Sequence, residues 1–315
     1  MIIVNGKKID IKHFPDGTQM LLDADLDDVF NSPMNHTVML FTIRWIYEND
    51  EELATIMYLT RHYHEKIPVP YLSKIRFRLV MDYLPNARMD RTKNLKEVFT
   101  LKYFCEFINS LKFDEVEVLD PHSNVGTALL NNLTVKSPEF YIKTVLDDIE
   151  GVDIDGGKSY GGTTVIYFPD EGAMKRYGDL RVFGNRAIIY GSKTREWETG
   201  KILGITIRDR NGNEIKGNSK TIPLRGAVVL MIDDIISYGG TLAYSADKLK
   251  TLGAQAIYAY ASHTENSVLD EEKGTLLKRL KDRTVDELFT TDSLYSGNCE
   301  FIEVIKNKDE YNTNS

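Results

Sequence analysis

Short apolar runs alternate with helix-length amphipathic segments along most of this 315-residue chain. Strands that are separated by helices pair in parallel, because parallel neighbours need a crossover connection. The pattern therefore predicts an α/β fold with mostly parallel sheets whose faces are covered by helices. The expected strands are Thr37–Thr42, Lys74–Asp82, Glu115–Asp120, Thr163–Phe168, Arg186–Tyr190, Ala227–Ile232, Ala256–Ser262 and Thr284–Thr290, and the expected helices are Glu51–Tyr63, Phe99–Leu111, Gly172–Arg181, Thr241–Leu252 and Gly274–Lys281.

The alternation occurs twice, and a chain of this length is typical of two domains. A glycine-rich turn, Asp153–Gly162 (DIDGGKSYGG), separates the two halves. We therefore expect one domain over residues 1–150 and a second over residues 151–315. The segment Gly200–Pro223 alternates in polarity and contains Asn211–Gly212, a hairpin turn signal, so it predicts a β-flap in the second domain.

Charge and composition exclude several classes of protein. The net charge of −8 argues against a general nucleic-acid or membrane surface. The only cysteines, Cys105 and Cys299, lack metal-ligand spacing, and a single pair makes no disulfide framework, which fits a reducing compartment. The N-terminus does not have the pattern of a signal peptide, and no apolar run has the roughly 20 residues needed to span a bilayer. We expect a cytoplasmic protein without nucleic-acid or membrane partners, whose C-terminal tail from Asn307 is frayed.

The chemistry is concentrated in Ala227–Thr241, which reads AVVLMIDDIISYGGT. An apolar strand ends in Asp233 and Asp234, and then a glycine pair opens an amphipathic helix. In open α/β sheets, ligands bind outside the carboxyl ends of strands, and the N-terminus of a following helix attracts phosphate. Adjacent carboxylates suit ribose hydroxyls or Mg²⁺. A polar strand end followed by a plain turn is the structural alternative, but the ordered set favours a site for a phosphorylated ribose.

With this segment, the chain resembles the type I phosphoribosyltransferases and, more closely, the ribose-phosphate diphosphokinases, also called phosphoribosyl-pyrophosphate synthetases. The resemblance extends over most of the chain as short segments in a shared order. It implies two tandem phosphoribosyltransferase-like domains, with ATP on the N-terminal side and the ribose phosphate on the C-terminal side. The further segments are His13–Gln19 (HFPDGTQ), Tyr83–Arg91 (YLPNARMDR), Val118–Gly126 (VLDPHSNVG), Phe168–Gly172 (FPDEG), Ile189–Arg195 (IYGSKTR), Tyr258–His263 (YAYASH) and Thr290–Leu294 (TTDSL).

The resemblance implies a transferase that moves the β,γ-diphosphoryl group of ATP to the anomeric 1-hydroxyl of ribose 5-phosphate. Such a reaction needs positioning and positive charge more than a strong base. Lys193 and Arg195 would supply that charge from a closing loop. The resemblance further implies that ATP is held by Phe14, Asp16, Arg88, Asp90 and His122, that Mg²⁺ is held by His122 and Asp170, and that the ribose phosphate is held by Asp233, Asp234, Ser237, Tyr238, Gly239, Gly240 and Thr241.

Several of these residues also have plain structural readings. Without the resemblance, Lys193 and Arg195 belong to a polar, solvated surface stretch, since charged runs usually lie on the surface. A lone histidine such as His122 is more often a satisfied structural residue than a ligand. Phe14 reads equally as a core anchor or as an aromatic that stacks on adenine.

The sequence departs from the resembled pattern at its most informative segment. Ser237–Tyr238 stands where the family usually has Asp-Thr, Thr18 replaces a glutamate, and Met89 replaces a glutamine. Residues 60–75 also form a longer connection than the family's. An aromatic beside the 5-phosphate site could stack against a group attached to that phosphate. The acceptor is therefore either ribose 5-phosphate or a substituted form such as ADP-ribose, which would link the protein to NAD metabolism rather than to nucleotide biosynthesis alone.

Three other classes stay open at this point. A phosphoribosyltransferase would consume the diphosphate with a nucleobase, and a non-catalytic relative would partner true synthetases. An unrelated two-domain nucleotide-binding protein would have to carry the Asp233–Asp234 and Gly239–Thr241 segment by chance. The resembled family also implies a homo-oligomer, because its adenine site is shared between subunits. The sequence leaves open the acceptor, the oligomer size, allosteric control, and whether Ser237–Tyr238 changes the substrate or abolishes activity.

Overall fold

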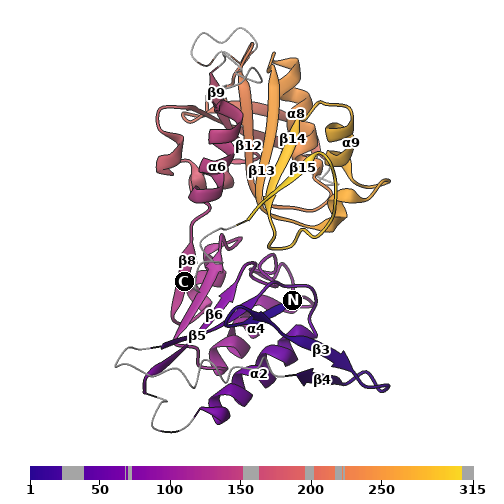
Figure 1. Cartoon of the computed structure of the whole chain (residues 1–315). Helices are drawn as coiled ribbons and strands as arrows, with labels where there is room; N and C mark the ends of the chain where they lie inside the picture. Colours follow the sequence, from indigo (N-terminus) through magenta and orange to yellow (C-terminus); the bar gives the residue numbers. More distant parts are fainter. Residues whose placement is uncertain are drawn as a thin grey trace. The chain divides into compact units, whose positions relative to one another are not determined.

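The chain forms two compact α/β units, of which the first comprises Met1–Ser137 and the second begins at Pro138 (Figure 1). The computed structural model describes residues 1–22, 39–67, 69, 73–151, 163–195, 202–216, 222 and 224–306. The expected linker Asp153–Gly162 and the tail from Asn307 lie outside these residues. No helix in this part of the chain combines the length and the apolar character required to cross a bilayer.

The first unit is built on a mostly parallel six-stranded sheet and a separate two-stranded hairpin. The unit contains the strands β1 (Ile2–Val4), β2 (Lys7–Lys8), β3 (Asp10–His13), β4 (Gln19–Leu22), β5 (Met39–Trp45), β6 (Ile75–Met81), β7 (Glu115–Leu119) and β8 (Leu133–Lys136), and the helices α2 (Glu52–Lys66), α4 (Thr100–Ser110) and α5 (Asn124–Leu129). Strands β5 to β8 run parallel in the order β5-β6-β7-β8, with β1 and β2 antiparallel at the edge. Large side chains such as Phe41, Trp45 and Tyr63 are buried between the sheet and its helices.

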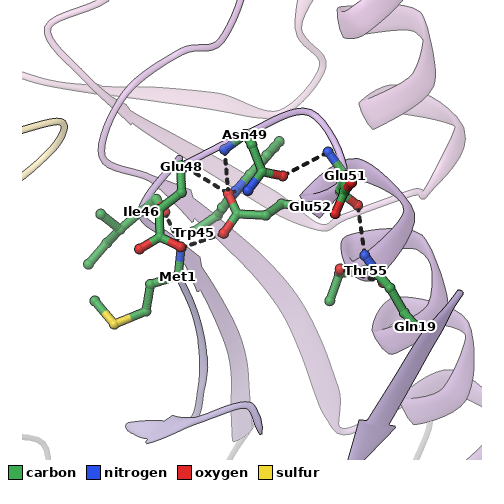
Figure 2. A network of polar contacts seen from close by, with 9 residues as sticks. All are labelled: Met1, Gln19, Trp45, Ile46, Glu48, Asn49, Glu51, Glu52 and Thr55. Atoms are coloured by element: carbon green, nitrogen blue, oxygen red, sulfur yellow. Dashed lines mark hydrogen bonds and ion pairs between the residues drawn. The ribbon is translucent and has the colours of Figure 1, made fainter. Parts of the chain in front are cut away.

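Strands β3 and β4 form a separate antiparallel hairpin that is tied to the start of α2. Figure 2 shows the polar contacts there: the Thr55 hydroxyl donates to Gln19 Oε1 at 2.8 Å, and Gln19 Nε2 donates to the Glu51 carbonyl at 3.3 Å. Beside them, buried Glu52 accepts from the Trp45 indole at 2.8 Å, which joins α2 to the central sheet. A hairpin that is too small to be stable alone is therefore held by a helix that is itself anchored in the core.

The second unit contains a seven-stranded sheet in the order β11-β10-β9-β12-β13-β14-β15. Its strands are β9 (Thr164–Phe168), β10 (Ala187–Arg195), β11 (Ile202–Asp209), β12 (Val228–Ile236), β13 (Ala256–Thr264), β14 (Glu287–Thr291) and β15 (Ile302–Ile305); its helices are α6 (Glu139–Glu150), α7 (Glu171–Tyr177), α8 (Gly240–Thr251) and α9 (Thr275–Lys281), with short 3-10 turns η1 (Arg181–Phe183) and η2 (Asn266–Leu269). All neighbours pair in parallel except β10 and β11, which form an antiparallel hairpin. The expected α/β class, parallel sheets and β-flap are confirmed.

The structure contains several elements that were not expected, namely β1 to β4, β8, β15 and α5, and it differs from the expectation at two further elements. Strand β12 does not end before the carboxylates but runs through Asp233 and Asp234, because β13 continues to pair with it as far as Thr264. Helix α6 was not expected, although its apolar residues recur at helical spacing along one face. This helix belongs to the second unit, whereas the expected boundary after residue 150 placed it with the first.

Candidate active site

The turn between β12 and α8 is fixed by its own backbone and by helix α9. Gly239 adopts φ +73°, in the left-handed region, and a Cβ at this position would stand 2.3 Å from Leu276 Cβ. The carbonyl of Tyr238 accepts backbone N–H donations from Thr275 at 3.0 Å and from Leu276 at 3.2 Å. Only glycine satisfies both the conformation and the contact, so the N-terminus of α8 faces the carboxyl end of β12 in one defined geometry.

Three carboxylates gather where β9 and β12 end. These strands pair in parallel, so Asp170, which follows β9, lies near Asp233 and Asp234 on β12. The pKa of Asp233 is raised well above its usual value, first by removal from water and second by Asp234, with a smaller contribution from Asp170. Arg176 of α7 lies 3.8 Å from Asp234 and partly balances the charge. The structure thus brings the predicted metal residue Asp170 together with the predicted ribose residues.

These residues fit the donor chemistry of Mg²⁺. The ion takes oxygen ligands and is usually bound by one or two carboxylates together with substrate phosphates. Asp170 Oδ1 accepts from Ala173 N at 3.0 Å and caps α7, which orients the carboxylate. Repulsion from the carboxylates of Asp234 and Asp170 contributes to the raised pKa of Asp233, and a bound cation would neutralise this repulsion. Within the described residues, the one group of three close potential ligands, Asp148, Glu287 and Glu303, lies elsewhere and includes neither predicted metal residue.

A cavity of about 400 Å³ lies beside Asp170, against the β10–β11 hairpin. Arg208 contributes a cation to its wall, and Arg208 Nη1 donates to the Gly212 carbonyl at 2.7 Å. The predicted catalytic residues Lys193 and Arg195 follow on the same hairpin, where Lys193 is paired with Ile205. Sequence reasoning did not single out Arg208, whose only signal is its place on the expected flap. The cavity is lined by Asp170, Glu171, Tyr190, Gly191, Ser192, Arg208 and Gly212.

In the first unit, the structure brings Asp90 and His122 together where β6 and β7 end. Arg91 binds the Asp90 carboxylate through two hydrogen bonds, of 2.8 Å from Nε and 3.0 Å from Nη2. The pKa of Asp90 is lowered, chiefly by this contact, with smaller effects from a hydrogen bond of Ser123 and from the charge of His122. Sequence reasoning predicted Asp90 and His122 but not Arg91, which directly follows Asp90 in the chain, nor Ser123, which approaches Asp90 only in the folded structure.

The remaining residues predicted for ATP are exposed. Arg88 lies in the loop after β6, and Phe14, at the end of the β3–β4 hairpin, has 50% of its surface exposed, so the reading of Phe14 as a core anchor is wrong. Asp16 Oδ1 accepts from the backbone N–H of Thr18 at 2.9 Å and from its hydroxyl at 2.7 Å. Thr18, which departs from the resembled pattern, therefore stabilises the hairpin turn together with Asp16.

The chain is similar to curated enzymes over most of its length, although no protein-family model matches it. It is 25% identical to a ribose-phosphate pyrophosphokinase of Thermococcus kodakarensis over 91% of this chain and 86% of that protein. It is 26% identical to a ribose-phosphate pyrophosphokinase of Pyrococcus furiosus over 70% of this chain and 67% of that protein.

The fold gives a matching result. A crystal structure of phosphoribosylpyrophosphate synthetase from Mycobacterium smegmatis superposes with a TM-score of 0.67, covering 95% of this chain and 86% of that chain at 13% identity. The match in fold therefore includes both α/β units described above. The chain is therefore similar in sequence to ribose-phosphate pyrophosphokinases and in fold to a phosphoribosylpyrophosphate synthetase, as expected of a transferase with a phosphoribosyltransferase-type fold.

Proposed function

We propose that this chain transfers the β,γ-diphosphoryl group of ATP to the 1-hydroxyl of ribose 5-phosphate, giving phosphoribosyl diphosphate and AMP. The observation that carries the proposal is the site at β12, where Asp233 and Asp234 meet Asp170 and a glycine turn opens α8. This arrangement offers carboxylates for ribose hydroxyls and a helix N-terminus for a phosphate. The curated relatives named above carry out this type of reaction by name.

In the proposed reaction, the chain positions two anionic substrates and offsets their charge. The free N–H groups at the start of α8 would hold the 5-phosphate, and Asp233 and Asp234 would orient the ribose. The anomeric oxygen forms a bond to the β-phosphorus, the bond from that phosphorus to the α-phosphate oxygen breaks, and the hydroxyl proton is released. Lys193 and Arg195 would stabilise the charge on the transferred group.

The first unit would hold ATP, with Asp90 and His122 as its centre and with Phe14, Asp16 and Arg88 as further contacts. Asp170 and His122 would each serve as a ligand of Mg²⁺, which would neutralise the diphosphate when bound. Phe14 is exposed, and the hydrogen bonds between Asp16 and Thr18 fix the turn beside it, which suits a contact with a second copy of the chain. We therefore propose a homo-oligomer. We further propose that it acts in the cytoplasm.

The proposal is tested by incubating the protein with ATP and Mg²⁺, in parallel with ribose 5-phosphate and with ADP-ribose, and identifying products by mass. We expect AMP together with one diphosphorylated acceptor. Folded protein that forms no AMP with either acceptor would contradict the proposal. Release of pyrophosphate from phosphoribosyl diphosphate with a nucleobase, without ATP, would instead show a phosphoribosyltransferase, and no reaction in either assay would favour a non-catalytic partner.

ADP-ribose is the second candidate acceptor, and Tyr238 is the observation that favours it. Tyr238 is 40% exposed, and its carbonyl accepts hydrogen bonds from the backbone N–H groups of Thr275 and Leu276 at the start of α9. These bonds fix the backbone of Tyr238, so its ring lies exposed beside the glycine turn. An aromatic ring there can stack on a base or sugar attached to the 5-phosphate.

Replacing Tyr238 by threonine is expected to move acceptor preference toward ribose 5-phosphate by about tenfold, the effect of roughly 1.4 kcal/mol of lost stacking. The measurement is the ratio of kcat/KM for the two acceptors. Tyr103→Thr is the matched control, since Tyr103 is also exposed (53%) but lies on α4 in the first unit. An unchanged ratio in Tyr238→Thr would remove the support for ADP-ribose.

A further inference from the structure

A buried tyrosine on an interior strand of the second unit's sheet is connected to the start of α8. Tyr167 lies on β9, paired with Ile189 of β10 on one side and with Met231 of β12 on the other. Its hydroxyl donates to Ser245 Oγ at 2.7 Å, and the Ser245 hydroxyl donates to the Thr241 carbonyl at 2.8 Å. Both side chains are fully buried, so these hydrogen bonds have no competition from water. The first turn of α8 is thus tied to β9 through two hydroxyl groups.

The same hydroxyl also defines the path of the β10–β11 hairpin. A Cβ at Gly191 would stand 2.3 Å from the Tyr167 hydroxyl oxygen and 3.0 Å from the Pro169 carbonyl. Any side chain at this position would displace either the tyrosine or the FPDEG segment, although the backbone of Gly191 needs no unusual φ. Strand β10 therefore approaches β9 closely at this point, shortly before Lys193 and Arg195.

The tyrosine is also held in its donor state. Burial raises its pKa, and the neighbouring carboxylates Asp170 and Asp233 raise it further, because a phenolate would lie close to negative charge. Tyr167 is consequently a neutral hydrogen-bond donor at neutral pH. Phenylalanine would keep the ring but would leave a buried Ser245 oxygen without its donor.

We propose that Tyr167 is a positioning residue, whose hydroxyl sets the start of α8 and its sugar-phosphate turn relative to the β10 strand that carries Lys193 and Arg195. The inference rests on the proposed function for its consequence in catalysis, but the positioning itself does not depend on the acceptor. It assigns a role to Tyr167 and Ser245, which lie outside the segments that resemble the family, and to Gly191, which lies within the segment Ile189–Arg195.

The variant Tyr167→Phe tests the positioning directly through amide hydrogen exchange of the peptide covering residues 237–246. We expect exchange there to become about tenfold faster, which corresponds to the loss of one buried hydrogen bond. Tyr260→Phe is the matched control, because Tyr260 is also fully buried in the same sheet with its hydroxyl 3.2 Å from a serine, Ser262. This control is expected to lose stability without faster exchange in residues 237–246.

Kinetics separates positioning from general destabilisation. In Tyr167→Phe, KM for the ribose-phosphate acceptor is expected to rise about tenfold while KM for ATP stays unchanged. The double variant with Ser245→Ala is expected to match the Tyr167→Phe variant, since both remove the same connection. Unchanged exchange in residues 237–246, or equal acceleration in the Tyr260→Phe control, would overturn the inference. A wild-type protein that turns over neither acceptor would contradict the proposed function, whereas the exchange result would still decide the positioning role.

Discussion

Replacing Gly239 by alanine is expected to destabilise the second unit strongly and to abolish acceptor binding. The alanine would have to adopt φ +73°, which costs about 1–2 kcal/mol for a residue with a Cβ. Its Cβ would also stand 2.3 Å from Leu276 Cβ, and overpacking of this kind costs about 1–3 kcal/mol. Together these effects predict a lower Tm by roughly 5–15 °C. Thermal unfolding and calorimetric titration with ribose 5-phosphate measure the two consequences.

Gly226→Ala separates the contribution of backbone conformation from that of the contact with α9. Gly226 has φ +80°, close to that of Gly239, but a Cβ there would meet nothing within 4 Å. We therefore expect only the conformational cost in this control, and unchanged acceptor binding. If both variants lose the same amount of stability, the close contact between Gly239 and Leu276 has no energetic role.

The second large effect is expected for Asp233→Asn, which should lose acceptor binding and yet gain stability. The variant keeps the shape of the side chain but removes one of the charges crowded at the end of β12. Loss of the carboxylate should lower kcat/KM for the acceptor by about 100-fold or more, as for other groups that contact the reacting substrate directly. Each kcal/mol of relieved repulsion should raise Tm by about 2–4 °C at neutral pH.

The gain in stability should depend on pH with a defined sign. The folded-state pKa of Asp233 lies above its ordinary value of 3.8, chiefly because of burial and then because of Asp234. The folded protein therefore holds this proton more tightly than the unfolded chain does, so the wild type loses stability as pH rises from 3.8 through the folded-state pKa. The Tm difference between Asp233→Asn and the wild type should therefore be small below pH 3.8 and should reach its largest value above the folded-state pKa of Asp233.

Thermal unfolding from pH 4 to pH 8 measures this difference, with Asp179→Asn as the control. The Asp179 side chain is 96% exposed, and its replacement should change neither Tm nor acceptor binding. A Tm difference for Asp233→Asn that does not grow with pH would show that Asp233 is not held at a raised pKa. Retained acceptor binding would remove it from the proposed ribose site.

Much of the architecture was predictable because the signals are local. The strands β9, β12 and β13 each contain a continuous apolar run, and most helices have a clear apolar face, so the α/β class and the parallel sheets followed from periodicity. Helix α6 also has an apolar face at helical spacing, but it was not predicted because it lies directly before the expected domain boundary at residue 150. The paired Asp233–Asp234 and the Gly239–Gly240 turn were equally visible, since their order along the chain already places them near a strand end and at a helix start, although β12 continues through both carboxylates.

The sequence by itself determined the fold class, the glycine turn before α8 and the family resemblance, because these depend on periodicity and on residues adjacent in the chain. The tertiary structure decided which distant side chains meet. Asp170 with Asp233, His122 with Asp90, and Tyr167 with Ser245 come from different elements or loops of the fold. Their pairing depends on strand order and register, which arise from packing of the whole sheet rather than from any local segment.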